Sequence, residues 1–430
     1  MDTKYIGSLL DFLAKSPCNF CAVDTAKRWL AANGFDERRL DEKLNAKPGD
    51  KFFVTKNDSA IFAVKVGRKK AADTGFKLIA AHSDSPCFRI KPKAEIKSDG
   101  GIVKLNTEVY GGPILYTWFD RPLSIAGRVI LRGADALHPV SRVLHIERPL
   151  LQISHLAIHF NRAVNEGNKL SKQKDMLPII AKLNGKLESD NLLTRLIASE
   201  LKVDASEILD FDLVLYDTEK PCTFGLNNEF ISAGRLDDLS MAHAALTAAI
   251  EGTDPDTTCV AAIFDNEETG SGTKQGAGSP VLANVLHRIV EEQGGSLEDF
   301  CIAMAKTFMV SADNAHAFHP NYAEKYDPTN HPTLGGGPCI KVNANCKYMS
   351  DAHSAAVFKQ LCAEAGVPCQ YFVNHSDVAG GSTLGNILTG QIDIEGVDVG
   401  NPLLAMHSVR ETGSVADHIY MIKAFKQFFS

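Results

Sequence analysis

Apolar segments of strand length alternate with longer helical patterns toward both ends of the chain. We expect strands at 77–81, 259–264, 308–312 and 370–373 and a hairpin at 52–66. Helices are expected at 5–13, 23–32, 238–250, 280–291, 352–365 and 414–429. Such alternation is typical of a mostly parallel sheet covered by helices. The sequence therefore predicts an α/β fold, with a mostly parallel mixed sheet flanked by helices.

The middle of the chain has a different pattern. It contains short alternating segments, frequent Gly and Pro, and one charged, helical stretch near residues 190–203. A chain of 430 residues also exceeds the usual length of one compact domain. We predict that residues 1–91 and 233–430 form one split α/β domain and that residues 92–232 form an inserted β-rich domain.

The net charge and the sequence of the N-terminus argue against several classes of partner and location. The formal net charge is −7, and the sequence offers no Lys/Arg block beyond 68–70, which argues against binding nucleic acid or an anionic membrane. The N-terminus carries no long apolar run of the kind found in signal peptides and membrane spans. We expect the protein to remain in the cytoplasm.

The ten cysteines are scattered, and several lie in apolar patterns typical of reduced core thiols. Cys18 and Cys21 form a lone CxxC motif. A structural zinc site would need a second pair of ligands at matching spacing, and the sequence has none. We therefore expect ordinary core cysteines here.

Metal-capable side chains follow the predicted strands or open the next helix. The carboxyl ends of parallel strands meet at one edge of a sheet, so these side chains are expected to converge. Five places carry such side chains: AHSD at 81–84, RLDD at 235–238, FDNEE at 264–268, SADN at 311–314 and MHS at 406–408. Two histidines and three carboxylates, one of them shared, suit a pair of divalent metals with open positions for water and substrate. This arrangement indicates hydrolysis.

Two further carboxylates have predicted roles beside these ligands. Strand alternation places His82 and Asp84 on one face, so Asp84 can accept the second ring N–H of His82 and fix its tautomer. Adjacent residues point in different directions, so Glu268 can ligate while Glu267 acts as the general base toward a water activated by the metals.

At these residues the chain resembles the aspartyl aminopeptidase (M18) family of dinuclear zinc metallopeptidases over nearly its whole length. The motifs that carry the resemblance are AHSDSPC at 81–87, ISHLAIH at 153–159, GRLDD at 234–238, FDNEE at 264–268 and SADNAHA at 311–317. The resemblance implies a cytoplasmic enzyme that removes N-terminal residues, preferably Asp and Glu, from peptides.

The resemblance also assigns roles to single residues. It implies that Asp237 bridges the metals, that His82 and Asp313 complete one site, and that Glu268 and His407 complete the other. Zinc is the expected metal, although His and carboxylate ligands also suit manganese and cobalt.

An assembly is implied in the same way. The family's inserted domain mediates dimerisation, and dimers build a tetrahedral dodecamer. His159 is then expected to reach into a neighbouring subunit's active site.

The specificity pocket is implied by the family as well. Lys341 occupies the position of the pocket lysine, and Tyr348 lies near it in the sequence. An acidic substrate side chain needs such a cationic partner. The alternative is a dimetal aminopeptidase of neutral or broad specificity, or an amino-acid deacylase, with the same ligands. A catalytically silent scaffold is a third reading.

Other histidines are expected outside the ligand set. We interpret His316 and His319 as flanking the metal cleft, and His375 as structural or as a support for the ligands.

Overall fold

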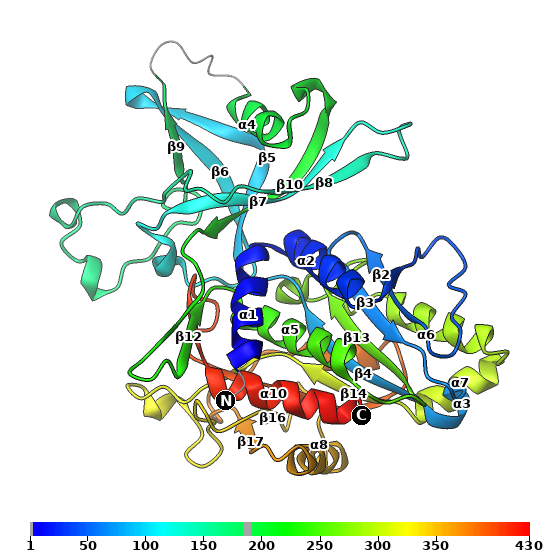
Figure 1. The fold of residues 1–430 in the computed structure, drawn as a ribbon. Helices are drawn as coiled ribbons and strands as arrows, with labels where there is room; N and C mark the ends of the chain where they lie inside the picture. The colour runs from blue at the N-terminus through cyan, green and yellow to red at the C-terminus, as the bar shows by residue number, and fades with distance from the viewer. Residues whose placement is uncertain (1–2, 184–190) are drawn as a thin grey trace. The chain divides into compact units, whose positions relative to one another are not determined.

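The computed structural model describes residues 3–183 and 191–430, which divide into two compact units (Figure 1). The first unit comprises Met1–Asp84, Pro221–Met406 and Glu411–Ser430, and the second comprises Ser85–Lys220 and His407–Arg410. The domain boundaries expected from sequence, at 91/92 and 232/233, and the dimerisation role remain predictions. Within the described residues, every helix is too short or too polar to cross a bilayer.

The first unit is built on a mixed, mostly parallel sheet of nine strands. In spatial order these are β1 (Asp36–Glu37), β2 (Lys51–Lys56), β3 (Ala60–Lys65), β13 (Thr258–Phe264), β4 (Phe76–His82), β14 (Phe308–Ala312), β18 (Glu395–Gly400), β16 (Cys339–Val342) and β17 (Gln370–Val373). The neighbours β13, β4, β14 and β18 run parallel, whereas β2, β3 and β13 pair antiparallel, as do β16 and β18. The predicted α/β class is confirmed.

Strand alternation gives this sheet two apolar faces. In β4, Ile79 and Ala81 enter one core cluster, whereas Leu78 and Ala80 enter another. Helices that pack into the first cluster are α1 (Thr3–Lys15), α2 (Asn19–Ala32), α5 (Leu236–Glu251), α8 (Ala352–Glu364) and α10 (Val415–Phe428). Helices on the second cluster are α3 (Ala71–Thr74), α6 (Val281–Glu292), α7 (Leu297–Ala305) and α9 (Leu384–Thr389). Helices therefore flank both faces.

Two small sheets complete the first unit. One consists of β11 (Cys222–Phe224), β12 (Phe230–Ala233) and β20 (Glu411–Ser414), and the other of β15 (Ala315–His316) and β19 (Pro402–Leu403).

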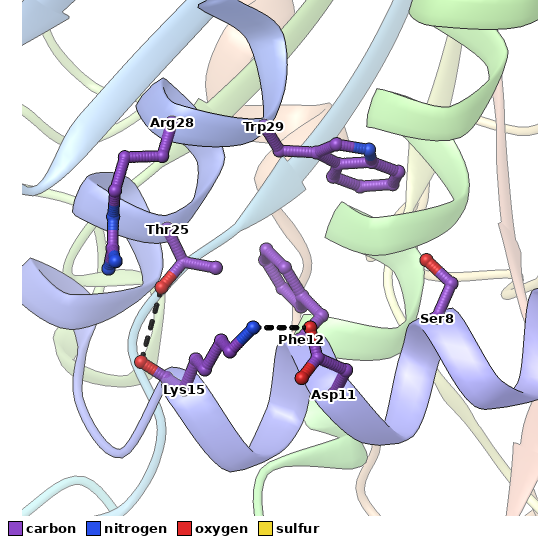
Figure 2. Close-up of a pocket in the computed structure, with 7 residues that line it drawn as sticks. All are labelled: Ser8, Asp11, Phe12, Lys15, Thr25, Arg28 and Trp29. Atoms are coloured by element: carbon purple, nitrogen blue, oxygen red, sulfur yellow. Dashed lines mark hydrogen bonds and ion pairs between the residues drawn. The ribbon is translucent and has the colours of Figure 1, made fainter. Parts of the chain in front are cut away.

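The N-terminal helices α1 and α2 are joined by a short, well-anchored connection. The Thr25 hydroxyl in α2 donates to the carbonyl of Lys15 at 3.2 Å, and Lys15 also pairs with Asp11 (Figure 2). Beside this joint is a pocket of about 260 Å³ that Phe12 and Trp29 help to line (Figure 2). Trp29 stacks on His243 of α5 with a centroid distance of 5.1 Å, which ties the pair of helices to the core.

The second unit is built on an antiparallel sheet with its own core. Its strands, in spatial order, are β8 (Val140–His145), β7 (Leu123–Leu131), β10 (Ile208–Asp217), β5 (Cys87–Ser98), β6 (Ile102–Tyr110) and β9 (Ile179–Lys182). Helix α4 (Leu192–Leu201) contributes Leu193 and Ile197 to that core. The helical stretch expected at 190–203 thus contains α4, while residue 190 lies outside the described residues.

Candidate metal centre

Three adjacent parallel strands deliver candidate ligands to one edge of the sheet. Phe264 of β13 lies opposite His82 of β4, and Ser311 of β14 lies opposite Ala80 of β4. Strands β4, β13 and β14 therefore end side by side, immediately before or at their metal-capable residues.

Four buried side chains converge at this edge. One potential ligand atom from each of His82, Asp237, Asp238 and Asp313 lies within 4.8 Å of the others. His82 Nε2 is 3.8 Å from Asp237 Oδ1. Burial raises the pKa of Asp313 and of Asp238, and neighbouring carboxylates raise both further. Carboxylates crowded together out of water favour a bound cation, so this donor set fits a divalent metal.

Contacts at Nδ1 fix the orientation of the His82 ring. Nδ1 lies 3.1 Å from the Asp84 carbonyl oxygen and 3.3 Å from its Oδ1. Both atoms are acceptors, so Nδ1 carries a proton, and Nε2, on the Asp237 side, is the nitrogen that could bind a metal. Burial by itself lowers the pKa of His82, but Asp238, Asp84 and Glu267 raise it well above its usual value.

Asp84 also anchors the turn that follows β13. Its Oδ1 and Oδ2 accept the backbone N–H groups of Glu267 and Glu268, each at 3.1 Å. The same turn starts with Asn266 in a left-handed conformation, φ 61°. A single buried carboxylate therefore orients both the candidate ligand His82 and the Glu267–Glu268 pair.

Sequence reasoning missed Asp238. Its Oδ2 accepts the backbone N–H of His82, and its Oδ1 accepts the Asn314 amide, each at 3.1 Å. Asp238 thus connects the end of β4 to the start of α5 and to the residue after Asp313. Its position directly after Asp237 was the only signal in the sequence. The local pattern does not say which of two adjacent carboxylates faces a metal.

Glu267 lies among acidic neighbours. The pKa of Glu267 is raised to about 8, mainly by burial. The charges of Asp313, Asp84 and Asp237 raise this pKa as well, whereas His82 lowers it. A bound metal cation opposes this rise, because positive charge favours the ionised carboxylate. Glu267 is therefore a carboxyl group whose protonation would respond to a cation bound in this cluster.

Lys341 of β16 is buried at the same edge, with 3 % of its surface exposed. Its Nζ is 3.4 Å from Asp313 Oδ1 and 5.7 Å from the centroid of the Tyr348 ring. Burial lowers the pKa of Lys341, but Asp313, Tyr348 and Asp398 raise it above its usual value. The ammonium is thus a fixed positive charge beside a candidate ligand.

Two predicted site residues belong to the second unit, so their approach to this centre stays a prediction. His407 Nδ1 lies 3.1 Å from the carbonyl oxygen of Gly112. His159 is exposed, in a short 3₁₀ turn at Ile158–Phe160.

Two other histidines, from the first unit, contact groups outside the ligand cluster. The ring of His316 contacts that of Phe372 with centroids 5.8 Å apart, and His375 Nδ1 accepts the N–H of Asp377.

Residues 12–429, which include every residue of this centre, match the family described as "Aminopeptidase I zinc metalloprotease (M18)". The chain belongs to the M18 family of zinc aminopeptidases. The resemblance noted in the sequence is confirmed at the level of this family.

Relatives match this M18 aminopeptidase over its full length. A "Probable M18 family aminopeptidase 2" from Clostridium novyi (strain NT) is 52% identical and covers 99% of both chains. The solved Ape4 in complex with Nbr1 is 37% identical with a TM-score of 0.95, covering 99% of this chain and 85% of that one. The mApe1 dodecamer from S. cerevisiae is 25% identical with a TM-score of 0.85, covering 98% and 95%. The M18 chain is accordingly a metalloaminopeptidase whose fold is that of its relatives.

Proposed function

We propose that this M18 aminopeptidase removes N-terminal Asp and Glu residues from peptides in the cytoplasm. The observation that carries the proposal is the buried ammonium of Lys341, which lies beside the ligand cluster and 3.4 Å from Asp313. A cation held in a low-dielectric site attracts a substrate carboxylate more strongly than a solvated lysine would.

The proposed centre holds two divalent ions, most simply zinc, with manganese or cobalt as substitutes. Asp237 is the bridging ligand, His82 and Asp313 complete one site, and Glu268 and His407 complete the other. The supporting chemistry is that imidazole and carboxylate donors suit these metals. When bound, the metals supply Lewis acidity and lower the pKa of a coordinated water.

Glu267 is the proposed general base. It accepts a proton from the attacking water and then delivers it to the leaving amine, which balances the proton across the reaction. Asp84 supports this role, because its carboxylate holds the backbone N–H groups of Glu267 and Glu268. The same carboxylate keeps the His82 Nε2 lone pair available for a metal.

Lys341 and Tyr348 form the proposed pocket for the acidic side chain. In the structure Asp313 is the carboxylate nearest to Nζ, and the ring of Tyr348 lies within cation–π reach. A substrate carboxylate would share the ammonium with Asp313, whose charge is in turn taken up by a metal. The alternative, a preference for neutral residues, requires that Lys341 serve only to balance the ligand carboxylates.

A homo-oligomer is part of the proposal. The mApe1 relative is described as a dodecamer, and we infer a tetrahedral dodecamer built from dimers for this chain. The segment around His159 supports a role in subunit contact, since Leu156, Ile158 and Phe160 are exposed to 59%, 46% and 81%. In this assembly His159 enters the active site of a neighbouring subunit.

Substitution of the general base tests the proposed reaction. Glu267→Gln should keep its metal content and assembly and lose turnover by at least about 100-fold, the usual size of a general-base contribution. Glu298→Gln, at an exposed position in the first turn of α7, is the matched control and should retain full activity. Undiminished turnover by metal-loaded Glu267→Gln would remove Glu267 from the mechanism.

A further inference from the structure

The CxxC motif lies where the connection from α1 enters α2. Cys18 is the N-cap of α2 and its Sγ accepts the backbone N–H of Cys21 at 3.5 Å. The two sulfur atoms are 3.3 Å apart, and the residues are exposed to only 6% and 2%. The expectation that these are core cysteines is thus correct as to burial, but the two thiols also contact each other directly.

Their surroundings make the two thiols unequal. Burial raises the pKa of Cys18, but contact with the Cys21 thiol, the N–H groups at the start of α2 and the charge of Arg235 lower it overall. Contact with Cys18 and burial raise the pKa of Cys21 well above its usual value. An N-terminal cysteine of this type is the nucleophile of dithiol redox motifs, and its neighbour keeps the proton.

The motif is also tied to the loops of the metal centre. Asn19, between the cysteines, donates from Nδ2 to both oxygens of Asp265, at 3.0 and 3.1 Å. Asp265 in turn accepts the backbone N–H of Asn266 at 2.8 Å, at the start of the Glu267–Glu268 turn.

A second tie comes from the other side. Arg235, two residues before Asp237, donates to the carbonyls of Ser16 and Leu13 at 3.0 and 3.4 Å. The segment that carries Cys18 is therefore linked both to the Glu267–Glu268 turn, through Asp265, and to the start of α5, where Asp237 lies, through Arg235. Ordinary core packing requires neither contact.

We propose that Cys18 and Cys21 are a peroxide-sensitive dithiol, and that their oxidation to a disulfide displaces Asn19 and so reduces turnover at the metal centre. The two sulfur atoms need to approach by about 1.3 Å to reach the bond length of about 2.05 Å. That movement acts on the residues between them, because Asn19 lies inside the ring that the disulfide closes. The effect on turnover rests on the proposed function, whereas disulfide formation does not.

Hydrogen peroxide is the oxidant. The Cys18 thiolate attacks one peroxide oxygen, the O–O bond breaks, an S–O bond forms, and the departing hydroxide takes a proton to become water. Cys21 sulfur then attacks Cys18 sulfur, the S–O bond breaks, and the hydroxyl leaves with the Cys21 proton as a second water. Two thiols are oxidised and one peroxide is reduced to two waters.

Peptide mapping tests the disulfide directly. The reduced, metal-loaded enzyme is treated with hydrogen peroxide, alkylated and digested with trypsin. Both cysteines fall in the peptide spanning residues 16–27, whereas another neighbouring pair, Cys362 and Cys369, falls in the separate peptide 360–410. We expect peptide 16–27 to lose the mass of two hydrogens, to resist alkylation and to regain both thiols with dithiothreitol. Alkylation of both thiols after peroxide treatment would overturn the proposal.

Turnover tests the coupling. We expect at least a threefold loss after peroxide, restored by dithiothreitol, which does not reverse methionine oxidation on this timescale. The Cys18→Ser/Cys21→Ser variant should keep normal turnover, because serine is a good N-cap, and should not respond to peroxide. A disulfide that leaves turnover unchanged, or an equal reversible loss in the double variant, would contradict the coupling. An enzyme inactive on acidic substrates would still give the mapping result.

Discussion

The ammonium of Lys341 lies 3.4 Å from the carboxylate of Asp313, so the residue proposed to select the substrate is in contact with a candidate metal ligand. This contact links specificity to the metal centre. If a metal binds Asp313, that carboxylate interacts with both the metal and the Lys341 ammonium. The ammonium is then less fully neutralised by Asp313 and can also attract a substrate carboxylate. Replacing Lys341 should therefore change which substrates are cleaved more than whether metal binds.

Lys341→Met should lower kcat/KM for N-terminal Asp by about 30- to 150-fold and leave N-terminal Leu within a few-fold. A charge-assisted pair of this kind contributes about 2–3 kcal/mol, which corresponds to that ratio. The measurement is kcat/KM on matched Asp- and Leu-amides with the metal content of each preparation. Lys325→Met, at an exposed position, is the control. A variant that keeps its full Asp-over-Leu ratio would remove Lys341 from the pocket.

Asp84→Asn should reduce activity or metal affinity about 10- to 100-fold, the usual cost of losing a residue that orients a metal ligand. An amide offers one acceptor oxygen where Asp84 uses two, so it cannot hold both the Glu267 and Glu268 N–H groups. Activity and metal retention during dialysis are the readouts, with Asp73→Asn at an exposed position as the control. Equal performance of the two variants would refute the positioning role.

Two buried histidines in the first unit should make it sensitive to acid. His243 Nδ1 lies 3.0 Å from His418 Nε2, and His243 Nε2 lies 3.0 Å from the Ser8 hydroxyl. Burial lowers the pKa of His418 to about 3, and burial together with His418 lowers that of His243 well below its usual value. Below about pH 6.5 the unfolded chain protonates both imidazoles, whereas the folded protein keeps them neutral until the pH falls to their lowered pKa values. The folded state thus binds fewer protons than the unfolded state in this range.

The stabilising contribution of this pair is complete above about pH 6.5 and is lost as the pH falls. The expected slope is about 1.4 kcal/mol per pH unit for each imidazole. Urea unfolding at pH 7 and pH 5 measures it, and His418→Gln should show a smaller loss than the unsubstituted protein. His287→Gln, on the partly exposed side of α6, should leave the slope unchanged. A slope unaffected by His418→Gln would contradict this account.

Sequence alone predicted the strands that carry the site. The segments that form β4, β13 and β14 are short apolar runs, each ending at or followed by His or acidic residues, so the strands and the candidate ligands at their ends could be recognised. The roles of single carboxylates were less accessible. Asp238 binds the N–H of His82, and this contact depends on how α5 docks at the end of β4.

Strand β18 was not predicted, for a physical reason. Its sequence, Glu-Gly-Val-Asp-Val-Gly, has the composition of a loop. A side chain at Gly396 would place its Cβ 2.4 Å from the Met309 carbonyl oxygen, and one at Gly400 would lie 2.0 Å from that of Asp313. The glycines are required by close packing against β14 and the residue after it, which a propensity pattern does not reveal.

The contact between Lys341 and Asp313 was equally hidden. The two residues lie on strands β16 and just beyond β14, which are separated in the sheet by β18. Strand order across a sheet is not contained in the local pattern, so the sequence indicated a lysine but not its partner.

The most direct test is an assay of the purified protein on matched Asp-, Glu-, Leu- and Ala-amides, with chelator and with zinc, manganese or cobalt added back. We predict that chelator abolishes cleavage, that metal restores it, and that Asp and Glu are preferred. Cleavage that favours Leu or Ala under every metal would contradict the proposed specificity, and cleavage that survives full metal removal would contradict the metal centre itself.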